Sequence, residues 1–220
     1  MSAVKVKICG ITRNSDLQTA VALGADALGF VVGVPASPRN LSIDQAARLI
    51  DRVPLFVTSV VVLVPPSVND VVHACEALHP DAVQLHGGGL NDLAQLRRAL
   101  PQVSVIRAIT APSLRLPEGA ADAAEGVDAV LLDSFAPGKV GGTGVVHDWT
   151  VSKRVKQIIH PTPLILAGGL TPANVRAAIH TVHPYAVDVS TGVEARPGQK
   201  DVAKLSAFIQ SVKEVKTHDP

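Results

Sequence analysis

A thiol and a carboxyl group each stand at the end of an apolar segment, where they could take part in proton transfer. Cys9 closes the alternating segment 4–9, and Asp133 follows the apolar run 129–132. A thiolate can act as a general base and a protonated carboxyl group as a general acid. The structural alternatives are a buried cysteine that acts as a small hydrophobic residue and an aspartate that caps the following loop.

Glycine-containing turns follow the last two apolar segments and could bind an anion. Gly168-Gly169 comes after the first of these segments, and Ser190-Thr191-Gly192 comes after the second. Glycine lets backbone N–H groups approach a phosphate closely. A further run, 141–144, could close over the same group, and we expect Gly142 to contact it. Left-handed turns also require glycine, so a structural role is the alternative for each turn alone.

Three other polar residues follow expected strands. Arg39 lies in the stiff loop Ser37-Pro38-Arg39, and Gln84 and His86 share one face of the segment that starts at residue 82. They could contact a ligand; the alternatives are a solvated surface arginine and polar groups at the mouth of a fold. No spacing of His, Cys and acidic residues is typical of a metal site, so we expect no metal.

Apolar segments with strand character alternate with helical patterns along the chain. The expected strands are 4–9, 27–32, 55–64, 82–85, 103–109, 129–133, 164–167 and 186–189. The expected helices are 14–23, 43–52, 67–78, 90–100, 150–160, 171–180 and 201–215, with a weaker helix within 112–126. Such alternation implies parallel strands, and eight units predict an α/β fold with a single (β/α)8 TIM barrel domain over residues 1–220. The alternative is an open doubly wound sheet, whose G-x-G-x-x-G turn is missing here.

In a parallel barrel the C-terminal ends of all strands share one rim, where the active site lies. We therefore expect one pocket to hold Cys9, Arg39, Gln84, His86, Asp133, Gly142, Gly168, Gly169, Ser190 and Gly192.

Barrel closure pairs the first strand with the last and makes a further prediction. Lys7 shares a strand face with Cys9, and Asp188 shares one with Ser190. We expect a buried Lys7–Asp188 ion pair below the rim; the alternative is that Lys7 points to solvent. A nearby ammonium lowers the pKa of a thiol, so we expect Lys7 to favour the Cys9 thiolate. Apolar surroundings would raise the pKa of Asp133.

The composition indicates no macromolecular partner. Of 220 residues, 47% are hydrophobic but only 3% aromatic, so the core consists of aliphatic residues that suit buried parallel strands. The net charge is +1 without blocks of like charge, so we expect no nucleic-acid and no membrane partner. With only Cys9 and Cys75 and no signal-peptide pattern, we expect a cytoplasmic protein without disulfides, with Cys75 in the core. Monomer and dimer are both compatible with the sequence.

The sequence resembles the phosphoribosylanthranilate isomerases of tryptophan biosynthesis from its first strand to Asp201. The motifs that carry the resemblance are Val6-Lys7-Ile8-Cys9-Gly10-Ile11-Thr12, Gly24-Ala25-Asp26-Ala27-Leu28-Gly29-Phe30, Ser37-Pro38-Arg39, Val83-Gln84-Leu85-His86-Gly87, Leu131-Leu132-Asp133, Gly141-Gly142-Thr143-Gly144, Ala167-Gly168-Gly169-Leu170, Val187-Asp188-Val189-Ser190 and Gly192-Val193-Glu194. The chain departs from the family pattern at His147, at Gly87-Gly88-Gly89 and within 59–64, none of which includes Cys9 or Asp133.

The resemblance implies a cofactor-free Amadori rearrangement of N-(5-phosphoribosyl)anthranilate, an aminoaldose, to the corresponding aminoketose. It implies that Cys9 and Asp133 are catalytic, that Arg39 contacts the anthranilate group, and that the turns at Gly168-Gly169 and Ser190 with Gly192 bind the phosphate. With Asp133 as acid and Cys9 as base, we expect a bell-shaped pH–rate profile. The alternatives are a different phosphosugar barrel, a barrel that binds a phosphorylated metabolite without catalysis, and a relative that also isomerises a histidine-pathway aminoaldose.

Overall fold

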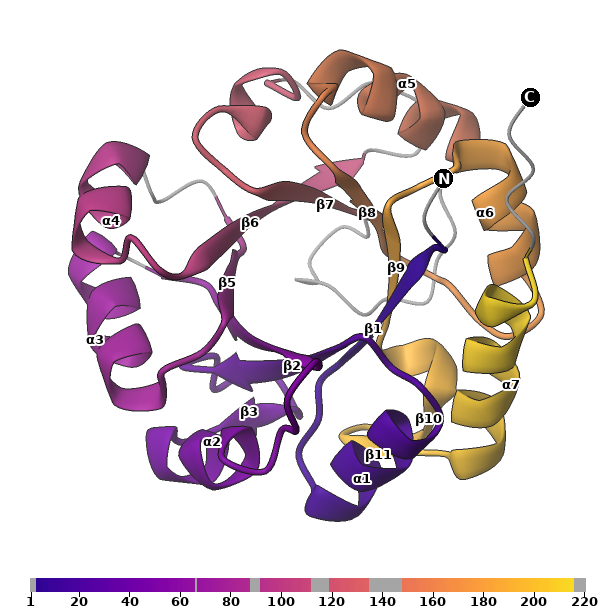
Figure 1. Cartoon of the computed structure of the whole chain (residues 1–220), viewed down its shortest axis with the longest axis horizontal. Helices are drawn as coiled ribbons and strands as arrows, with labels where there is room; N and C mark the ends of the chain where they lie inside the picture. Colours follow the sequence, from indigo (N-terminus) through magenta and orange to yellow (C-terminus); the bar gives the residue numbers. More distant parts are fainter. Residues whose placement is uncertain (1–2, 66, 88–91, 112–118, 135–147, 216–220) are drawn as a thin grey trace.

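The strands form a closed parallel barrel with helices outside it (Figure 1). The computed structural model describes residues 3–65, 67–87, 92–111, 119–134 and 148–215. Around the barrel the strands follow the order β1 (Lys5–Cys9), β9 (Ala186–Val189), β8 (Leu164–Leu166), β7 (Ala129–Ser134), β6 (Ser104–Ala111), β5 (Ala82–Leu85), β4 (Thr58–Leu63) and β2 (Ala27–Val32). A β1–β2 pairing closes the ring, which confirms the predicted (β/α)8 barrel and excludes the open sheet.

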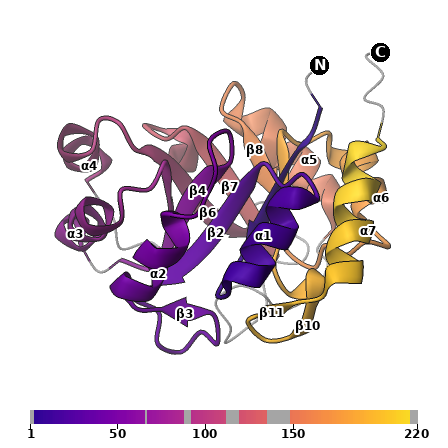
Figure 2. The same ribbon diagram turned by 60° about the horizontal axis from the view of Figure 1, so that its bottom comes forward.

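Seven described α-helices surround the barrel (Figures 1 and 2). They are α1 (Asn14–Ala22), α2 (Ile43–Ile50), α3 (Val68–Leu78), α4 (Leu93–Ala99), α5 (Trp149–Ile159), α6 (Val175–Val182) and α7 (Val202–Lys213). Short polar side chains begin several of them; Ser42, for example, forms a capping box with Gln45 at the start of α2. None of the described helices combines the length and the hydropathy that crossing a membrane requires.

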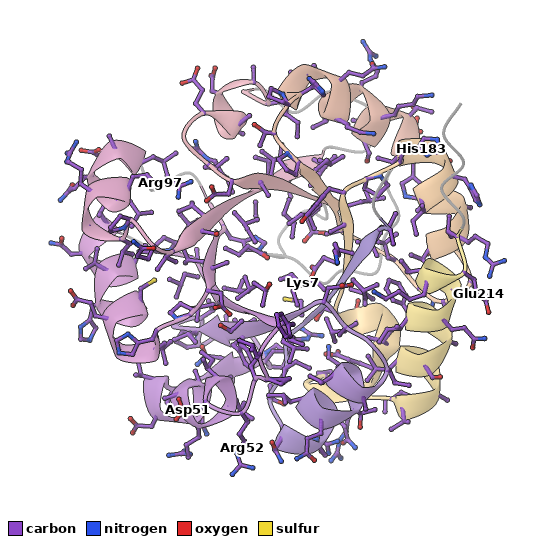
Figure 3. All side chains as sticks on the ribbon, in the orientation of Figure 1. Lys7, Asp51, Arg52, Arg97, His183 and Glu214 are labelled. Atoms are coloured by element: carbon purple, nitrogen blue, oxygen red, sulfur yellow. The ribbon has the colours of Figure 1, made fainter. Side chains whose placement is uncertain are left out.

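The side chains of β1 alternate between two environments. Val6 and Ile8 are fully buried in the layer between sheet and helices, whereas Cys9 packs in the smaller cluster inside the barrel. Lys7 also faces inward, close to the barrel axis in Figure 3, whereas the labelled charged residues Asp51 and Glu214 lie on the periphery. The face of the first strand that carries Lys7 and Cys9 therefore lines the barrel interior.

Several element boundaries differ from the predictions for local reasons. The third strand begins at Thr58 rather than at residue 55, because Leu55 and Phe56 are exposed and Phe56 adopts a φ of 71°. The predicted helix start at Thr171 is wrong: the Asn174 side chain accepts a hydrogen bond from the Thr171 N–H, which makes a turn before α6. Of the weak helix within 112–126, residues 112–118 lie outside the described residues, and the rest contains only a 3-10 turn at η1 (Asp122–Ala124).

Three short strands were not predicted. β3 (Asn40–Leu41) pairs with the end of β2, and β10 (Glu194–Arg196) forms an antiparallel hairpin with β11 (Gln199–Lys200). The hairpin follows the 3-10 turn η2 (Thr191–Val193) and precedes α7. Figure 2 shows β3 and the hairpin at the same end of the barrel. Segments of two or three residues are too short for a periodic pattern, so the sequence gives no sign of them.

Candidate active site

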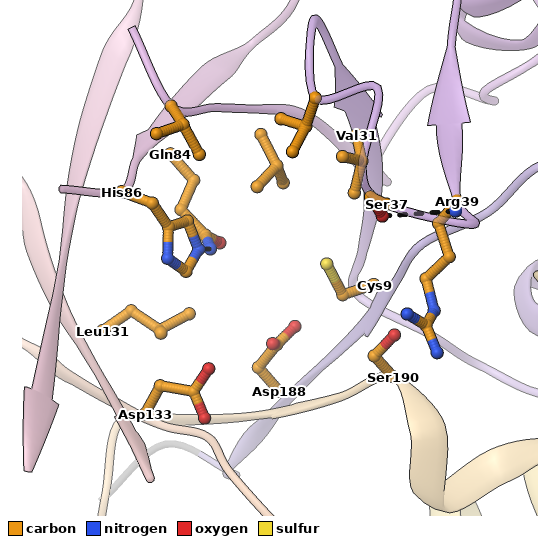
Figure 4. A pocket seen from close by; sticks show the side chains of 13 residues that line it. Cys9, Val31, Ser37, Arg39, Gln84, His86, Leu131, Asp133, Asp188 and Ser190 are labelled. Carbon is orange, nitrogen blue, oxygen red and sulfur yellow. Dashed lines mark hydrogen bonds between the residues drawn. The ribbon is translucent and has the colours of Figure 1, made fainter. Parts of the chain in front are cut away.

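Six of the predicted site residues line one pocket at the C-terminal rim (Figure 4). The lining residues are Cys9, Val31, Val34, Ser37, Arg39, Val62, Val64, Gln84, His86, Leu131, Asp133, Asp188 and Ser190. They come from most of the barrel strands and from the loop after β2, so the convergence depends on barrel closure. Gly142 and His147 lie outside the described residues.

The thiol and the carboxyl group face the same cavity from different strands. Cys9 ends β1 and Asp133 lies near the end of β7, with β9 and β8 between the two strands. Figure 4 shows the Cys9 sulfur and the Asp133 carboxyl group directed into the pocket, with Asp188 between them. Both residues are buried, so a ligand in this pocket would meet them out of bulk water.

Below the rim, Lys7 donates a hydrogen bond of 2.8 Å to the Asp188 carboxylate. The β1–β9 register places the two residues opposite each other, and their side chains are 3% and 10% exposed. The predicted buried ion pair is therefore confirmed. Burial alone would lower the pKa of Lys7, but the charge and the hydrogen bond of Asp188, together with the neighbouring Cys9, outweigh this effect and raise the pKa.

Lys7 lowers the pKa of Cys9, as expected, but the net pKa of the thiol is raised. Burial raises the pKa of the thiol, and this effect exceeds the opposing influence of the Lys7 and Lys200 ammonium groups. The Asp188 carboxylate also raises this pKa, because it disfavours a second negative charge nearby. Cys9 therefore rests as a thiol at neutral pH.

Close packing around Cys9 depends on Gly29 in β2. A Cβ at this position would lie 2.9 Å from the Cys9 sulfur and 3.1 Å from the Lys7 nitrogen. Such contacts are shorter than ordinary van der Waals separations. The absence of a side chain at Gly29 thus lets the lysine and the cysteine lie against the neighbouring strand.

Gln84 and His86 form a polar pair in the pocket wall. The Gln84 amide nitrogen donates to His86 Nε2 at 2.6 Å, which leaves the ring proton of the neutral imidazole on Nδ1. Burial, together with the Lys7 charge, lowers the pKa of His86 to about 4, so the ring is neutral at pH 7. Gln84 is 1% exposed, and its amide oxygen is buried with no hydrogen-bond partner among the described residues. Such an oxygen favours a ligand that brings an N–H or O–H donor.

Arg39 is held by an acidic residue that the sequence analysis did not select. Its Nε and Nη2 donate to the two carboxylate oxygens of Glu194 at 2.7 and 2.6 Å, and its side chain is only 13% exposed. A freely solvated surface arginine is therefore excluded. Lys200 also donates to Glu194, at 3.1 Å. Glu194 lies in the motif Gly192-Val193-Glu194 and Lys200 follows six residues later, but only their contacts across the fold reveal their connection to the pocket.

The candidate phosphate turns lie against each other. Gly168 and Gly169 have φ values of 82° and 63°, a conformation that favours glycine. Gly192 lies so close to the next turn that a Cβ there would be 1.9 Å from the Leu170 carbonyl oxygen. The loops after β8 and β9 therefore form one glycine-dependent unit beside Ser190.

No group of three or more His, Cys, Asp or Glu side chains able to hold a metal ion occurs in the described part of the chain.

Comparisons with known proteins match one family over nearly the whole chain. The family model for N-(5'phosphoribosyl)anthranilate (PRA) isomerase matches residues 6–211. The chain is 44% identical to the N-(5'-phosphoribosyl)anthranilate isomerase of Methanothrix thermoacetophila, over 95% of this chain and 98% of the relative.

Solved structures of the same kind superpose over nearly the whole chain. The crystal structure of phosphoribosyl anthranilate isomerase from Thermotoga maritima is 38% identical, with a TM-score of 0.83, and covers 96% of this chain and 100% of its own. A second crystal structure, 36% identical with a TM-score of 0.80 and the same coverage, is a complex with reduced 1-(o-carboxyphenylamino)-1-deoxyribulose 5-phosphate.

Loss of the Lys7 ammonium should strongly destabilise the fold. Lys7→Met leaves the buried Asp188 carboxylate without this partner, so we expect a loss of ~3–5 kcal/mol in the free energy of unfolding, measured with urea. The double variant Lys7→Met/Asp188→Asn should regain much of this loss, because no buried charge remains unpaired. Lys5→Met is the control. Lys5 lies on the same strand as Lys7 and pairs with Asp26, but its side chain is 47% exposed, so we expect a loss of about 1 kcal/mol or less in the free energy of unfolding. Equal losses for Lys5→Met and Lys7→Met would contradict the importance of the buried pair.

Alkylation should report the resting thiol of Cys9. Cys75→Ala leaves Cys9 as the single cysteine, so the rate of reaction with iodoacetamide follows its thiolate fraction. Because the pKa of Cys9 is raised, the rate should be low at pH 7 and still rise with pH above about 8.5, the ordinary thiol value. The alkylation rate of the free amino acid cysteine under the same conditions is the reference. A rate that levels off below pH 8 would show that the ammonium groups prevail over burial.

Proposed function

Since the chain belongs to the N-(5'-phosphoribosyl)anthranilate isomerase family and is an isomerase of tryptophan biosynthesis, we propose that Cys9 and Asp133 carry the two proton transfers of its reaction. The reaction converts N-(5-phosphoribosyl)anthranilate into 1-(2-carboxyphenylamino)-1-deoxyribulose 5-phosphate. The observation that carries the proposal is the placement of both side chains in one buried pocket, directed into the same cavity.

The chemistry of an Amadori rearrangement defines the two roles. Asp133 donates its proton to the ring oxygen of the ribose, the bond from this oxygen to C1 breaks, and an iminium ion forms at C1. Cys9 loses its thiol proton to water, and the resulting thiolate then removes the proton from C2, so that the electrons of that C–H bond neutralise the iminium to give an enolamine. Tautomerisation of the enolamine to the ketone completes the rearrangement, so the acid and the base act at neighbouring atoms.

The remaining pocket residues match the polar groups of this substrate. The unpartnered Gln84 oxygen can accept from the anilino N–H or a ribose hydroxyl, and neutral His86 adds a ring N–H donor without a charge. Arg39 retains N–H groups beyond the two that Glu194 accepts, and we assign these to the anthranilate carboxylate. We assign the phosphate to the unit formed by Gly168, Gly169, Ser190 and Gly192, and a contact from Gly142 stays a prediction from the sequence. The phosphorylated analogue bound by a solved relative supports this assignment.

We further propose that the reaction needs neither metal nor cofactor and takes place in the cytoplasm. Proton transfers by a thiol and a carboxyl group require no further reagent. The two unpaired cysteines are typical of a reducing compartment.

The decisive assay follows the fluorescence of N-(5-phosphoribosyl)anthranilate. The purified protein should abolish this fluorescence in the presence of EDTA. Cys9→Ala and Asp133→Asn should each lower kcat by about 10²–10⁴-fold with a smaller change in KM, because each removes a proton-transfer group. Cys75→Ala removes the other thiol, on α3, and should retain its activity. Full activity of both Cys9→Ala and Asp133→Asn would refute the assigned roles.

Substitution of Gly192 should weaken phosphate binding rather than the chemical step. In Gly192→Ala the added methyl group meets the Leu170 carbonyl and must displace one of the two turns. Loss of one charge-assisted hydrogen bond raises KM about tenfold to hundredfold with less effect on kcat, and inhibition by inorganic phosphate should weaken in parallel. Gly24→Ala, at the end of α1 and with a φ of 96°, is the control for a strained glycine substitution away from the pocket and should leave KM unchanged. An unchanged phosphate inhibition constant in Gly192→Ala would place the phosphate elsewhere.

A further inference from the structure

Lys200 in the β10–β11 hairpin is buried although it carries an ammonium group. The side chain is 1% exposed, which is rare for lysine. Its nitrogen donates to the Cys9 carbonyl oxygen at 2.6 Å, to the Ser190 carbonyl oxygen at 3.1 Å and to Glu194 Oε1 at 3.1 Å. All three atoms are acceptors, so three N–H donors are required and the group is the charged ammonium.

These contacts join the two strand ends that carry the proposed base and the phosphate turn. Cys9 is the last residue of β1, and Ser190 follows β9 directly. The backbone N–H of Lys200 is itself fixed, because it donates to the buried carboxylate of Asp16 in α1 at 2.9 Å. The hairpin therefore anchors one ammonium against both strand ends.

The same network reaches the residue assigned to the anthranilate carboxylate. Glu194 accepts from Lys200 and, through both oxygens, from Arg39. The Arg39 side chain crosses Gly10, where a Cβ would lie 2.4 Å from its Cδ. Lys200, Glu194 and Arg39 thus pack as one cluster around the end of β1.

We propose that Lys200 is a positioning residue for the isomerisation, which holds the Cys9 and Ser190 backbone and the Glu194–Arg39 pair in register and supplies the positive charge that favours the Cys9 thiolate. This proposal rests on the proposed function of Cys9 as the base. Two cations and one anion make up the cluster, so one positive charge remains after Glu194 is counted. Removal of Lys200 leaves a neutral pair, and removal of the Glu194 charge leaves two cations.

Other charged or titratable groups also face Cys9, and a substitution of Lys200 or Glu194 leaves these residues unchanged. Lys7 lies on the same strand, Asp188 on β9, and Arg39 on the loop after β2, while His86 and Asp133 line the opposite walls of the pocket. Of these groups, Lys7 favours the thiolate and Asp188 disfavours it. The test must therefore compare changes in pKa rather than absolute values.

The test measures iodoacetamide alkylation of Cys9 against pH in the Cys75→Ala background, together with kcat. Lys200→Met should raise the apparent pKa of Cys9 by about one unit, whereas Glu194→Gln should lower it. Opposite shifts of the Cys9 pKa in the two variants are diagnostic, because general damage to the fold would shift this pKa in the same direction in both. Lys200→Met should lower kcat about tenfold at pH 7, with a deficit that shrinks as the pH rises above the thiol pKa of the parent protein.

Lys204→Met is the matched control. Lys204 is exposed and donates to the Glu194 backbone oxygen at 2.8 Å, so this variant removes a neighbouring lysine without touching Cys9. It should leave the alkylation profile and kcat unchanged. If Lys200→Met does not fold, Glu194→Gln still tests the proposal. A Cys9 pKa in Glu194→Gln that is equal to or higher than that of the parent protein overturns the proposal.

The two proposals fail in different ways. Retained turnover in Cys9→Ala would overturn the base assignment and, with it, a role for Lys200 in the reaction. An inactive Cys9→Ala together with parental alkylation profiles in Lys200→Met and Glu194→Gln would overturn the role of Lys200 alone.

Discussion

The register between β1 and β9 is the constraint on which the site depends. It places Lys7 opposite Asp188, and the next inward position of each strand carries Cys9 or Ser190. Because side chains alternate along a strand, a slip of one residue would turn Lys7 and Cys9 outward into the layer occupied by Val6 and Ile8. The buried ion pair opposes such a slip, since each charge would lose its partner. Barrel closure and the position of the proposed base are therefore fixed by the same contact.

Charges around Cys9 alternate in space. Lys7 pairs with Asp188 beneath the pocket, and Arg39 and Lys200 share Glu194 beside it. These five groups carry three positive and two negative charges, so an excess of one positive charge faces a substrate that contains a phosphate and a carboxylate. Neutral His86 does not add to this charge. The arrangement attracts an anion, while each buried charge retains a partner close enough to offset its desolvation.

Most of the fold was predictable because aliphatic strands bounded by turns repeat along the chain. The strands at Ala27–Val32, Ala82–Leu85 and Ala186–Val189 agree with the predicted bounds, and two-residue periodicity combined with closure was enough to predict the Lys7–Asp188 pair.

The start of α6 was missed because it depends on a side-chain hydrogen bond from Asn174 to a neighbouring turn. The link from Lys200 to Cys9 spans 191 positions of sequence and has no periodic signature. The influence of Lys7 on the Cys9 pKa was predictable, but the net rise of this pKa was not, because sequence shows which charges are near but not how completely water is excluded.

A raised thiol pKa is consistent with a base that must act only after the substrate has changed. A resting thiolate would add a third negative charge beside Asp188 and Glu194 and would repel an anionic substrate. As a thiol, Cys9 leaves the positive excess of the pocket intact during binding. Ring opening then creates an iminium cation beside the sulfur, and a nearby positive charge lowers the pKa of a thiol. In the proposed reaction the iminium cation therefore favours loss of the Cys9 proton to water, while Lys7 and Lys200 limit how far burial raises the thiol pKa beforehand.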